Sequence, residues 1–306
     1  MDDYYYDEEE IDLLKLVSTN ANDANQFILF DGSNDELYAI NVSKIRELII
    51  YKDVEILRNQ SDNFIVGTGD IRGELTTIVN FDHWIGNKPD ADDKYELIIV
   101  AAYGGHRLGI VVKSVENIIT IDSEDMSDNS SANPKSTFVA KVEIYSESKM
   151  VTIFDSDMLL SDIFPDVEEK SDTQLDTLSY EITAKGYFMF ADDSKYIRVM
   201  LERLCQKMQL NYEIYENGKE LLAAVFKKRA EDISLIISDI EMPVMGGREL
   251  IDSIRKNSDY DSVNIIVHTN MSNDIMKEEL LELGAQKIIG KVNIVSLAAA
   301  INELAK

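Results

Sequence analysis

The chain has 306 residues, of which 57 are acidic and 30 are basic, giving a formal net charge of −27 at pH 7. A hydrophobic content of 45% is typical of a globular protein, and the length predicts two domains. Nucleic acid and anionic membrane surfaces carry charge of the same sign, so we expect neither as a partner.

The negative charge lies mainly in the first part of the chain. Residues 1–183 contain 38 acidic and 14 basic residues, whereas residues 184–306 contain 19 and 16. Two patches stand out: residues 1–12 carry seven acids and no base, and residues 155–183 carry nine acids and one base. We predict that these patches are a solvated tail and a solvated linker rather than binding surfaces.

Cys205 is the single cysteine, which excludes an internal disulfide and a cysteine-based zinc site. It lies in an apolar stripe at helical spacing, which predicts a buried thiol. The N-terminus is acidic and does not have the pattern of a signal peptide. The longest apolar runs are far shorter than the roughly 18 residues of a membrane span. We therefore expect a cytoplasmic protein that does not insert into a membrane.

From residue 25 onward, short apolar runs alternate with turns, as in an all-β barrel or sandwich. Turn-rich segments at 31–35 and 104–107 predict two hairpins. Only short helices are expected in this part of the chain, including 42–49 and 156–163. The runs that we expect as strands are 26–30, 37–42, 75–81, 97–103, 108–112, 118–121, 138–144 and 150–154.

After a charged stretch at 166–183, the hydrophobic pattern changes. Short apolar runs typical of strands now alternate with apolar residues at helical spacing. Such alternation predicts a parallel sheet with helices on both faces, whose site lies beyond the carboxyl ends of the strands. The expected strands are 187–190, 212–215, 234–238, 264–268 and 286–289. The expected helices are the stripe over 197–208 and the segments 218–228, 247–256, 273–283 and 294–305.

Polar residues fall at these strand ends. Asp192 and Asp193 follow the first strand, Asp239 ends the third, Thr269 ends the fourth and Lys291 follows the fifth. Three carboxylates at one edge repel one another and need a compensating cation. Ligation by oxygen alone selects a hard ion, and Mg²⁺ fits best.

This arrangement predicts phosphoryl chemistry. Asp239 is the candidate nucleophile, which would form an acyl phosphate. Lys291 and Mg²⁺ would stabilise charge on the transferring group, and Thr269 would donate a hydrogen bond to a phosphoryl oxygen.

Two motifs carry a family resemblance. The stretch FMFADDS at 188–194 and the stretch SDIEMPVMGG at 238–247 resemble those of receiver domains of two-component response regulators. The resemblance covers 184–306 and implies a doubly wound α/β (βα)5 fold with Mg²⁺-dependent transfer from a histidine kinase to Asp239. It also implies the metal ligands Asp192, Asp193, Asp239 and, through its backbone carbonyl, Glu241.

Three positions differ from that family's pattern. Ile288 stands where an aromatic switch residue is usual, Val292 replaces a proline, and Asn270 follows Thr269 where a small residue is commoner. These differences leave the acceptor chemistry intact and bear on how phosphorylation is transmitted.

The first region contains no catalytic constellation. Its segment IVGTGDIRGELTTIVNFDHWIG at 65–86, and the strand pair and short helix over 138–165, resemble CheW-like coupling domains. This resemblance implies two small SH3-like β-barrels that dock onto a chemotaxis histidine kinase and onto chemoreceptor cytoplasmic tips. Arg72, in the turn Arg72-Gly73, is the candidate partner-binding residue. The histidines His83, His106 and His268 have no zinc-binding spacing, and we expect no other cofactor site.

The whole chain is thus similar to CheV-type chemotaxis coupling proteins. We expect a tail at 1–24, a CheW-like domain at 25–165, a linker at 166–183 and a receiver domain at 184–306. The implied function is a non-enzymatic scaffold at receptor arrays that phosphorylation of Asp239 modulates, either for adaptation or as a phosphate sink. The alternative is a Mg²⁺-dependent phosphohydrolase in which Asp239 turns over.

Overall fold

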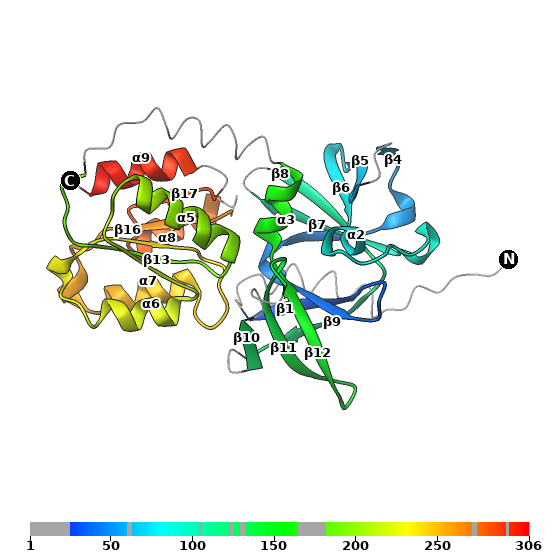
Figure 1. Cartoon of the computed structure of the whole chain (residues 1–306), viewed down its shortest axis with the longest axis horizontal. Coiled ribbons are helices and arrows are strands. Elements are labelled where there is room, and N and C mark those ends of the chain that lie inside the picture. The colour runs from blue at the N-terminus through cyan, green and yellow to red at the C-terminus, as the bar shows by residue number, and fades with distance from the viewer. Residues whose placement is uncertain are drawn as a thin grey trace. The chain divides into compact units, whose positions relative to one another are not determined.

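The computed structural model describes residues 25–59, 63–103, 106–122, 125–128, 133–164, 182–270, 274–291 and 294–305. The contacts divide the chain into two compact units, Met1–Phe154 and Asp155–Lys306 (Figure 1). The expected tail at 1–24, and all but the last two residues of the expected linker at 166–183, lie outside the described residues. Among the described residues, no helix combines the length and the apolar character that crossing a bilayer requires.

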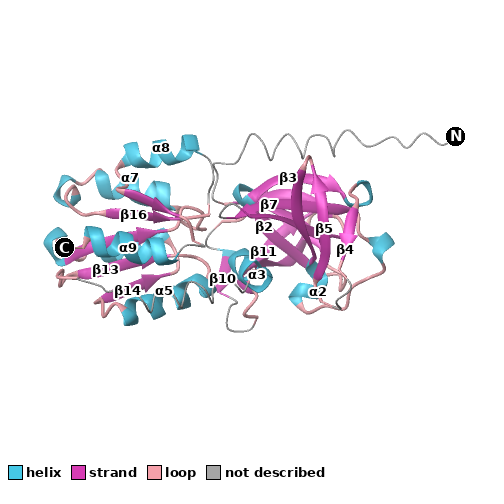
Figure 2. Cartoon of the chain, turned by 90° about the horizontal axis from the view of Figure 1, so that it is seen from above, coloured by secondary structure: helices cyan, strands magenta, loops and turns pink. Residues whose placement is uncertain are grey.

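The first unit consists mainly of strands (Figure 2). One six-stranded sheet has the order β10-β11-β12-β2-β1-β9, and a second has the order β3-β7-β8-β6-β5-β4. The prediction of an all-β first domain is therefore confirmed. The strands are β1 (Gln26–Asp31), β2 (Leu37–Asn41), β3 (Ile45–Ile50), β4 (Ile56–Arg58), β5 (Ile65–Ile71), β6 (Glu74–Asn80), β7 (Leu97–Tyr103), β8 (His106–Val112), β9 (Val115–Thr120), β10 (Met126–Asp128), β11 (Ser136–Ile144) and β12 (Glu147–Phe154).

Both expected hairpins form, since β1 pairs with β2 and β7 pairs with β8, each in antiparallel register. The helix predicted over 42–49 was wrong. A single 3₁₀ turn at Val42–Lys44 is followed by β3, which pairs with β7. The β-branched isoleucines of 45–50 are compatible with a short helix and with a strand. Pairing with β7 stabilises the strand.

Aromatic residues fill part of the first unit's core. Phe81 and Trp84, both in the short helix α2 (Phe81–Ile85), are buried. The Phe81 ring centroid lies 4.8 Å from that of Phe30 and 5.1 Å from that of Phe154. These edge-to-face contacts link β1, α2 and the end of β12.

The second unit has a five-stranded parallel sheet of order β14-β13-β15-β16-β17. This order is that of a doubly wound sheet, so the α/β fold predicted for the receiver region is confirmed. The strands are β13 (Tyr187–Ala191), β14 (Tyr212–Tyr215), β15 (Ile233–Ser238), β16 (Ile265–His268) and β17 (Lys287–Ile289). The helices are α3 (Ser156–Ile163), α5 (Lys195–Lys207), α6 (Gly218–Val225), α7 (Gly247–Arg255), α8 (Asp274–Leu283) and α9 (Ile294–Leu304).

Helices cover both faces of this sheet, as Figure 1 shows. Buried residues of α5 and α9, including Leu201, Cys205 and Leu297, pack on one face. Buried residues of α6, α7 and α8, including Leu221 and Leu250, pack on the other. Asp192, Asp239 and Lys291 follow the carboxyl ends of β13, β15 and β17, between these two helical layers.

Candidate functional site

The sheet brings the predicted strand-end residues to one edge. Asp239, which directly follows β15, donates its backbone N–H to the carbonyl of Ala191 at the end of β13, at 2.9 Å. Thr269, which directly follows β16, donates its backbone N–H to the carbonyl of Ile289 at the end of β17, also at 2.9 Å. The ends of four neighbouring strands are thereby held side by side, as parallel pairing requires.

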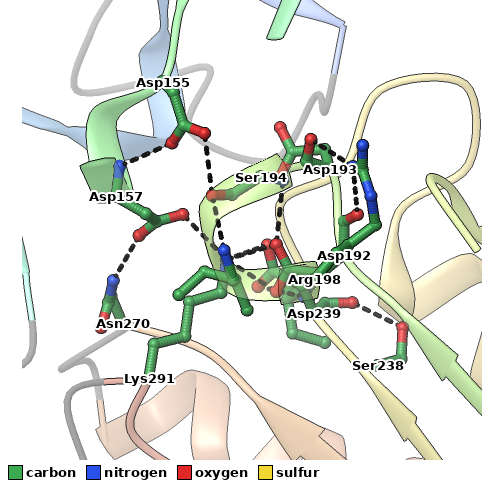
Figure 3. A network of polar contacts seen from close by, with 12 residues as sticks. Asp155, Asp157, Asp192, Asp193, Ser194, Arg198, Ser238, Asp239, Asn270 and Lys291 are labelled. Carbon is green, nitrogen blue, oxygen red and sulfur yellow. Dashed lines mark hydrogen bonds and ion pairs between the residues drawn. The ribbon is translucent and has the colours of Figure 1, made fainter. Parts of the chain in front are cut away.

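Lys291 lies among the carboxylates at this edge (Figure 3). Its Nζ is 2.9 Å from Asp239 Oδ2 and 3.1 Å from Asp192 Oδ2. The side chains of all three residues are almost completely buried. The structure therefore brings together a candidate nucleophile, a candidate metal ligand and the candidate cationic group.

Burial and repulsion shape the electrostatics of the cluster. Burial raises the pKa of Asp192 well above its usual value, Asp239 and Asp157 raise it further, and Lys291 opposes the change. Burial by itself would lower the pKa of Lys291, but the surrounding carboxylates outweigh that effect and raise this pKa well above its usual value. One buried ammonium is thus shared by more acidic groups than it neutralises.

Hydrogen bonds orient Asp239, the candidate phosphoryl acceptor, and the nearby Asp192. Asp239 Oδ1 accepts a hydrogen bond from the backbone N–H of Ile240 at 2.7 Å. Its backbone carbonyl accepts one from Ser238 Oγ, also at 2.7 Å. Asp192 Oδ1 accepts one from the backbone N–H of Ser194 at 3.0 Å. The sequence folds in this way because β13 and β15 end at adjacent positions of the sheet and each is followed by a helix.

Asp155, which caps α3, and Asp157, in the first turn of α3, join this cluster. Neither was among the predicted site residues. Asp157 Oδ2 lies 3.0 Å from Lys291 Nζ, and Asp157 Oδ1 accepts a hydrogen bond from Asn270 Nδ2 at 2.8 Å. Asp155 Oδ2 accepts a hydrogen bond from Ser194 Oγ at 2.9 Å. Asp155 and Asp157 are 1% and 4% exposed, so the prediction that the acids of 155–183 are solvated was wrong for these two.

The physical reason is that partners far along the chain desolvate these acids. Burial raises the pKa of Asp155 to about 6, and the neighbouring charge of Asp157 adds to the increase. The local pattern of an acid at the start of a short helix indicates only a capping residue, and Asp155 does accept hydrogen bonds from the backbone N–H groups of Asp157 and Met158.

A buried histidine lies beside the cluster. His268, the last residue of β16, is 1% exposed, and neither ring nitrogen has a hydrogen-bond partner among the described residues. Burial, together with the positive charge of Lys291, lowers its pKa to about 3, so the ring is neutral at pH 7. The side chain of His106 lies outside the described residues.

Three buried carboxylates of the cluster could ligate a divalent cation. Oxygen atoms of Asp157, Asp192 and Asp193 all lie within 4.8 Å of one another, and all three residues are buried. Asp192 Oδ2 has no hydrogen-bond partner among the described residues, although it is ion-paired with Lys291. An all-oxygen set with excess negative charge fits a hard cation such as Mg²⁺.

The other predicted site residues lie outside this cluster or beside it. Glu241 is half-buried in the loop between β15 and α7, two residues after Asp239. Ile288 is half-buried in β17 and packs against the core cluster of α6, α7 and α8. Val292 lies outside the described residues.

Arg72 lies in the first unit, in the two-residue turn between β5 and β6. Its φ of 54° and the φ of 83° at Gly73 place both residues in the left-handed region that such tight hairpins need. Arg72 Nε contacts Glu47 Oε2 at 2.7 Å, while 77% of the Arg72 side chain remains exposed. Arg107 contacts the other Glu47 oxygen at 2.9 Å. The turn and the exposed arginine are therefore as predicted, whereas partner binding stays a prediction.

Comparisons with known proteins agree with this geometry. Residues 26–164 match the family model described as "CheW-like domain", and residues 188–302 match "Response regulator receiver domain". "Chemotaxis protein CheV2" of Helicobacter pylori is 28% identical over 303 residues, which cover 94% of this chain and 96% of the relative. "Chemotaxis protein CheV1" of the same organism is 25% identical over 304 residues, which cover 91% of this chain and 92% of the relative.

The fold, the strand-end cluster and these matches define a signalling protein that carries a response regulator receiver domain after a CheW-like domain. Along nearly its whole length, the chain is similar to the CheV proteins of Helicobacter pylori.

Proposed function

We propose that this protein is a chemotaxis scaffold that couples chemoreceptors to a histidine kinase and that phosphorylation of Asp239 modulates it. The observation that carries the proposal is the contact of Asp239 Oδ2 with Lys291 Nζ at 2.9 Å, inside a buried carboxylate cluster. That cluster belongs to a chain which also contains a CheW-like domain. In this proposal the CheW-like domain contacts the kinase and the receptor tips, with Arg72 at the contact, so the protein is located at receptor arrays.

In the proposed chemical step, a carboxylate oxygen of Asp239 attacks the phosphorus of a phosphohistidine. An O–P bond forms and the P–N bond of the donor breaks, with the electron pair leaving on the imidazole nitrogen. The product is an acyl phosphate on Asp239.

The chain's own residues orient and stabilise this step. The backbone N–H of Ile240 holds Asp239 Oδ1, which leaves Oδ2 on the side of Lys291. The ammonium of Lys291 offsets charge on the transferring oxygens, and the Thr269 hydroxyl donates a hydrogen bond to one of them. Asp192 and Asp193, with Asp239 and the Glu241 carbonyl, would hold Mg²⁺, which neutralises charge on the phosphoryl group when bound.

A phosphotransfer experiment tests the acceptor. The full-length protein is incubated with Mg²⁺ and acetyl phosphate, and intact-mass spectrometry is used to look for one added phosphoryl group. We expect a single addition that requires Mg²⁺ and is absent from Asp239→Asn. Undiminished labelling of Asp239→Asn would exclude Asp239 as the acceptor. Continuous release of phosphate from monoesters would instead favour a phosphohydrolase.

A pull-down experiment tests the scaffold separately. The protein is mixed with a purified chemotaxis histidine kinase and a chemoreceptor cytoplasmic fragment. We expect it to bind both, and binding to neither would overturn the scaffold role. If phosphorylation leaves both affinities unchanged, the receiver domain acts as a phosphate sink instead of a regulator of the scaffold.

A further inference from the structure

The segment that follows the last strand of the first unit reaches the acceptor site. β12 ends at Phe154, Asp155 caps the next helix, and α3 begins at Ser156. By sequence, α3 lies inside the CheW-like match at 26–164, whereas by its contacts it belongs to the unit Asp155–Lys306. A piece of one family's domain is thus packed against the functional site of the other.

Asp157 takes up the contacts that a phosphoryl group on Asp239 would need. One of its oxygens lies 3.0 Å from Lys291 Nζ, and Lys291 Nζ also lies 2.9 Å from Asp239 Oδ2. Its other oxygen accepts a hydrogen bond from Asn270, the residue directly after Thr269. The carboxylate of Asp157 is therefore an anion bound by the same lysine and the same loop that the acyl phosphate would use.

A second contact holds α3 in this position. Asp155 Oδ2 accepts a hydrogen bond from Ser194 Oγ at 2.9 Å, beside the acids Asp192 and Asp193. Asp155 and Asp157 are both almost fully buried, so they contact the site without intervening solvent (Figure 3). A carboxylate and a phosphoryl group cannot occupy the same space beside Lys291, and their like charges repel each other.

We propose that Asp157 occupies the phosphoryl subsite of the acceptor site, so that docking of α3 and phosphorylation of Asp239 exclude each other. This inference rests on the proposed function and adds an internal ligand to it. By linkage, docked α3 disfavours the phosphorylated state at equilibrium by the same factor by which the phosphoryl group weakens docking of α3. Phosphorylation would then release the end of the CheW-like match from the receiver domain.

The first test measures phosphorylation of full-length Asp157→Ala with acetyl phosphate and Mg²⁺, with the donor below saturation. The variant keeps the backbone N–H that Asp155 caps, so the start of α3 is preserved. We expect the initial rate of labelling to rise between about fivefold and a hundredfold, the range of ordinary allosteric coupling. Asp162→Ala is the matched control, since it removes an exposed carboxylate from the last turn of the same helix and should leave the rate unchanged.

Calorimetric titration with Mg²⁺ alone separates this role from metal ligation. If Asp157 occupies the phosphoryl subsite, Asp157→Ala binds Mg²⁺ at least as tightly as the wild type. Weaker Mg²⁺ binding together with slower labelling would make Asp157 a ligand of the cation and would overturn the inference.

The second test uses the wild-type protein and hydrogen exchange of residues 155–164. Beryllofluoride with Mg²⁺ serves as a stable analogue of the phosphoryl group, and Mg²⁺ alone serves as the control. We expect the analogue to increase exchange in α3, and unchanged exchange would overturn the inference. If wild type and Asp157→Ala label equally fast, the inference fails while the proposed function stands. If neither protein becomes labelled, both fail.

Discussion

Gly247 lies directly against the backbone carbonyl of Asp239. A Cβ atom built on Gly247 would be 2.1 Å from that carbonyl oxygen, which is closer than any van der Waals contact allows. The first residue of α7 must therefore be a glycine for the acceptor loop to keep its shape. We expect Gly247→Ala to destabilise the second unit by about 1–3 kcal/mol and to slow labelling of Asp239.

Gly290→Ala is the control for that substitution. Its added Cβ would meet only the Thr269 carbonyl oxygen, at an ordinary 3.9 Å. Urea denaturation should therefore show little change in stability for this variant. If both variants lose the same free energy of unfolding, the close approach of Gly247 to the Asp239 carbonyl is not the reason why Gly247→Ala is destabilised.

Cys205 should report unfolding of the second unit. Its side chain is fully buried in the core cluster of α5 and α9, and burial raises the pKa of its thiol. Because the thiolate is the reactive form, we expect the native protein to react with a thiol reagent far more slowly than the urea-unfolded protein. Equal rates in the two states would show that α5 opens readily.

Removal of one carboxylate should stabilise the site at the expense of its function. Burial and the neighbouring acids raise the pKa of Asp192, so its charged form is held at a free-energy cost. We expect Asp192→Asn to increase the free energy of unfolding by about 1 kcal/mol or more and to weaken Mg²⁺-dependent labelling. Pulsed labelling of Cys205 across a urea titration measures the first effect. Asp252→Asn, on the surface of α7, is the control and should change stability by less than about 0.5 kcal/mol.

His268 should make the second unit sensitive to acid. Its pKa is about 3 in the folded protein against 6.5 for the unperturbed side chain, so only the unfolded chain binds a proton between these values. Stability from this residue is therefore complete above about pH 6.5 and falls by about 1.4 kcal/mol per pH unit below it.

The variant His268→Leu isolates this effect, because no described residue loses a hydrogen bond to the ring. We expect the difference in unfolding free energy between wild type and variant to change with pH between about 6.5 and 4, and to be constant between pH 7 and 8. The exposure of Cys205 on unfolding can be measured in this pH range with a thiol reagent that is active in acid, such as 4,4′-dithiodipyridine. A difference independent of pH would contradict the assignment of a neutral buried ring.

Arg72 should matter for binding rather than for folding. Its guanidinium is mostly exposed, and a single exposed ion pair contributes little to stability. We expect Arg72→Ala to change the free energy of unfolding by less than about 0.5 kcal/mol while weakening binding to the histidine kinase or the receptor fragment. Lys141→Ala, at an exposed position of β11, is the control. Unchanged binding of Arg72→Ala to both partners would remove Arg72 from the contact.

The site of the second unit was largely predictable because its residues closely follow strands that the sequence pattern reveals. Asp192 and Asp239 directly follow β13 and β15, and Lys291 comes two residues after β17. Parallel pairing then carries all three to one edge of the sheet. The segment 45–50 shows the opposite case, because its isoleucines fit either a short helix or a strand. Only the pairing of β3 with β7, some fifty residues along the chain, resolves that choice.

Asp157 could not have been found from the sequence. Its partners Asn270 and Lys291 lie 113 and 134 residues away, and no periodicity encodes such a contact. In the sequence, Asp157 is one of nine acids in an acidic stretch, and the usual interpretation of such a stretch is a solvated surface. Among the acids of this stretch that the structure describes, burial distinguishes Asp155 and Asp157 from the exposed Asp162.

The parallel pairing of β12 with β2 has a consequence for synthesis of the chain. Val151 lies opposite Leu37 and Ile153 lies opposite Ala39, so strands more than a hundred residues apart close one sheet. Until β12 leaves the ribosome, β2 has an open edge, and loop closure of this length is slow. The first unit therefore completes this sheet only after β12 has emerged, and until then the edge of β2 is open to pairing with another chain.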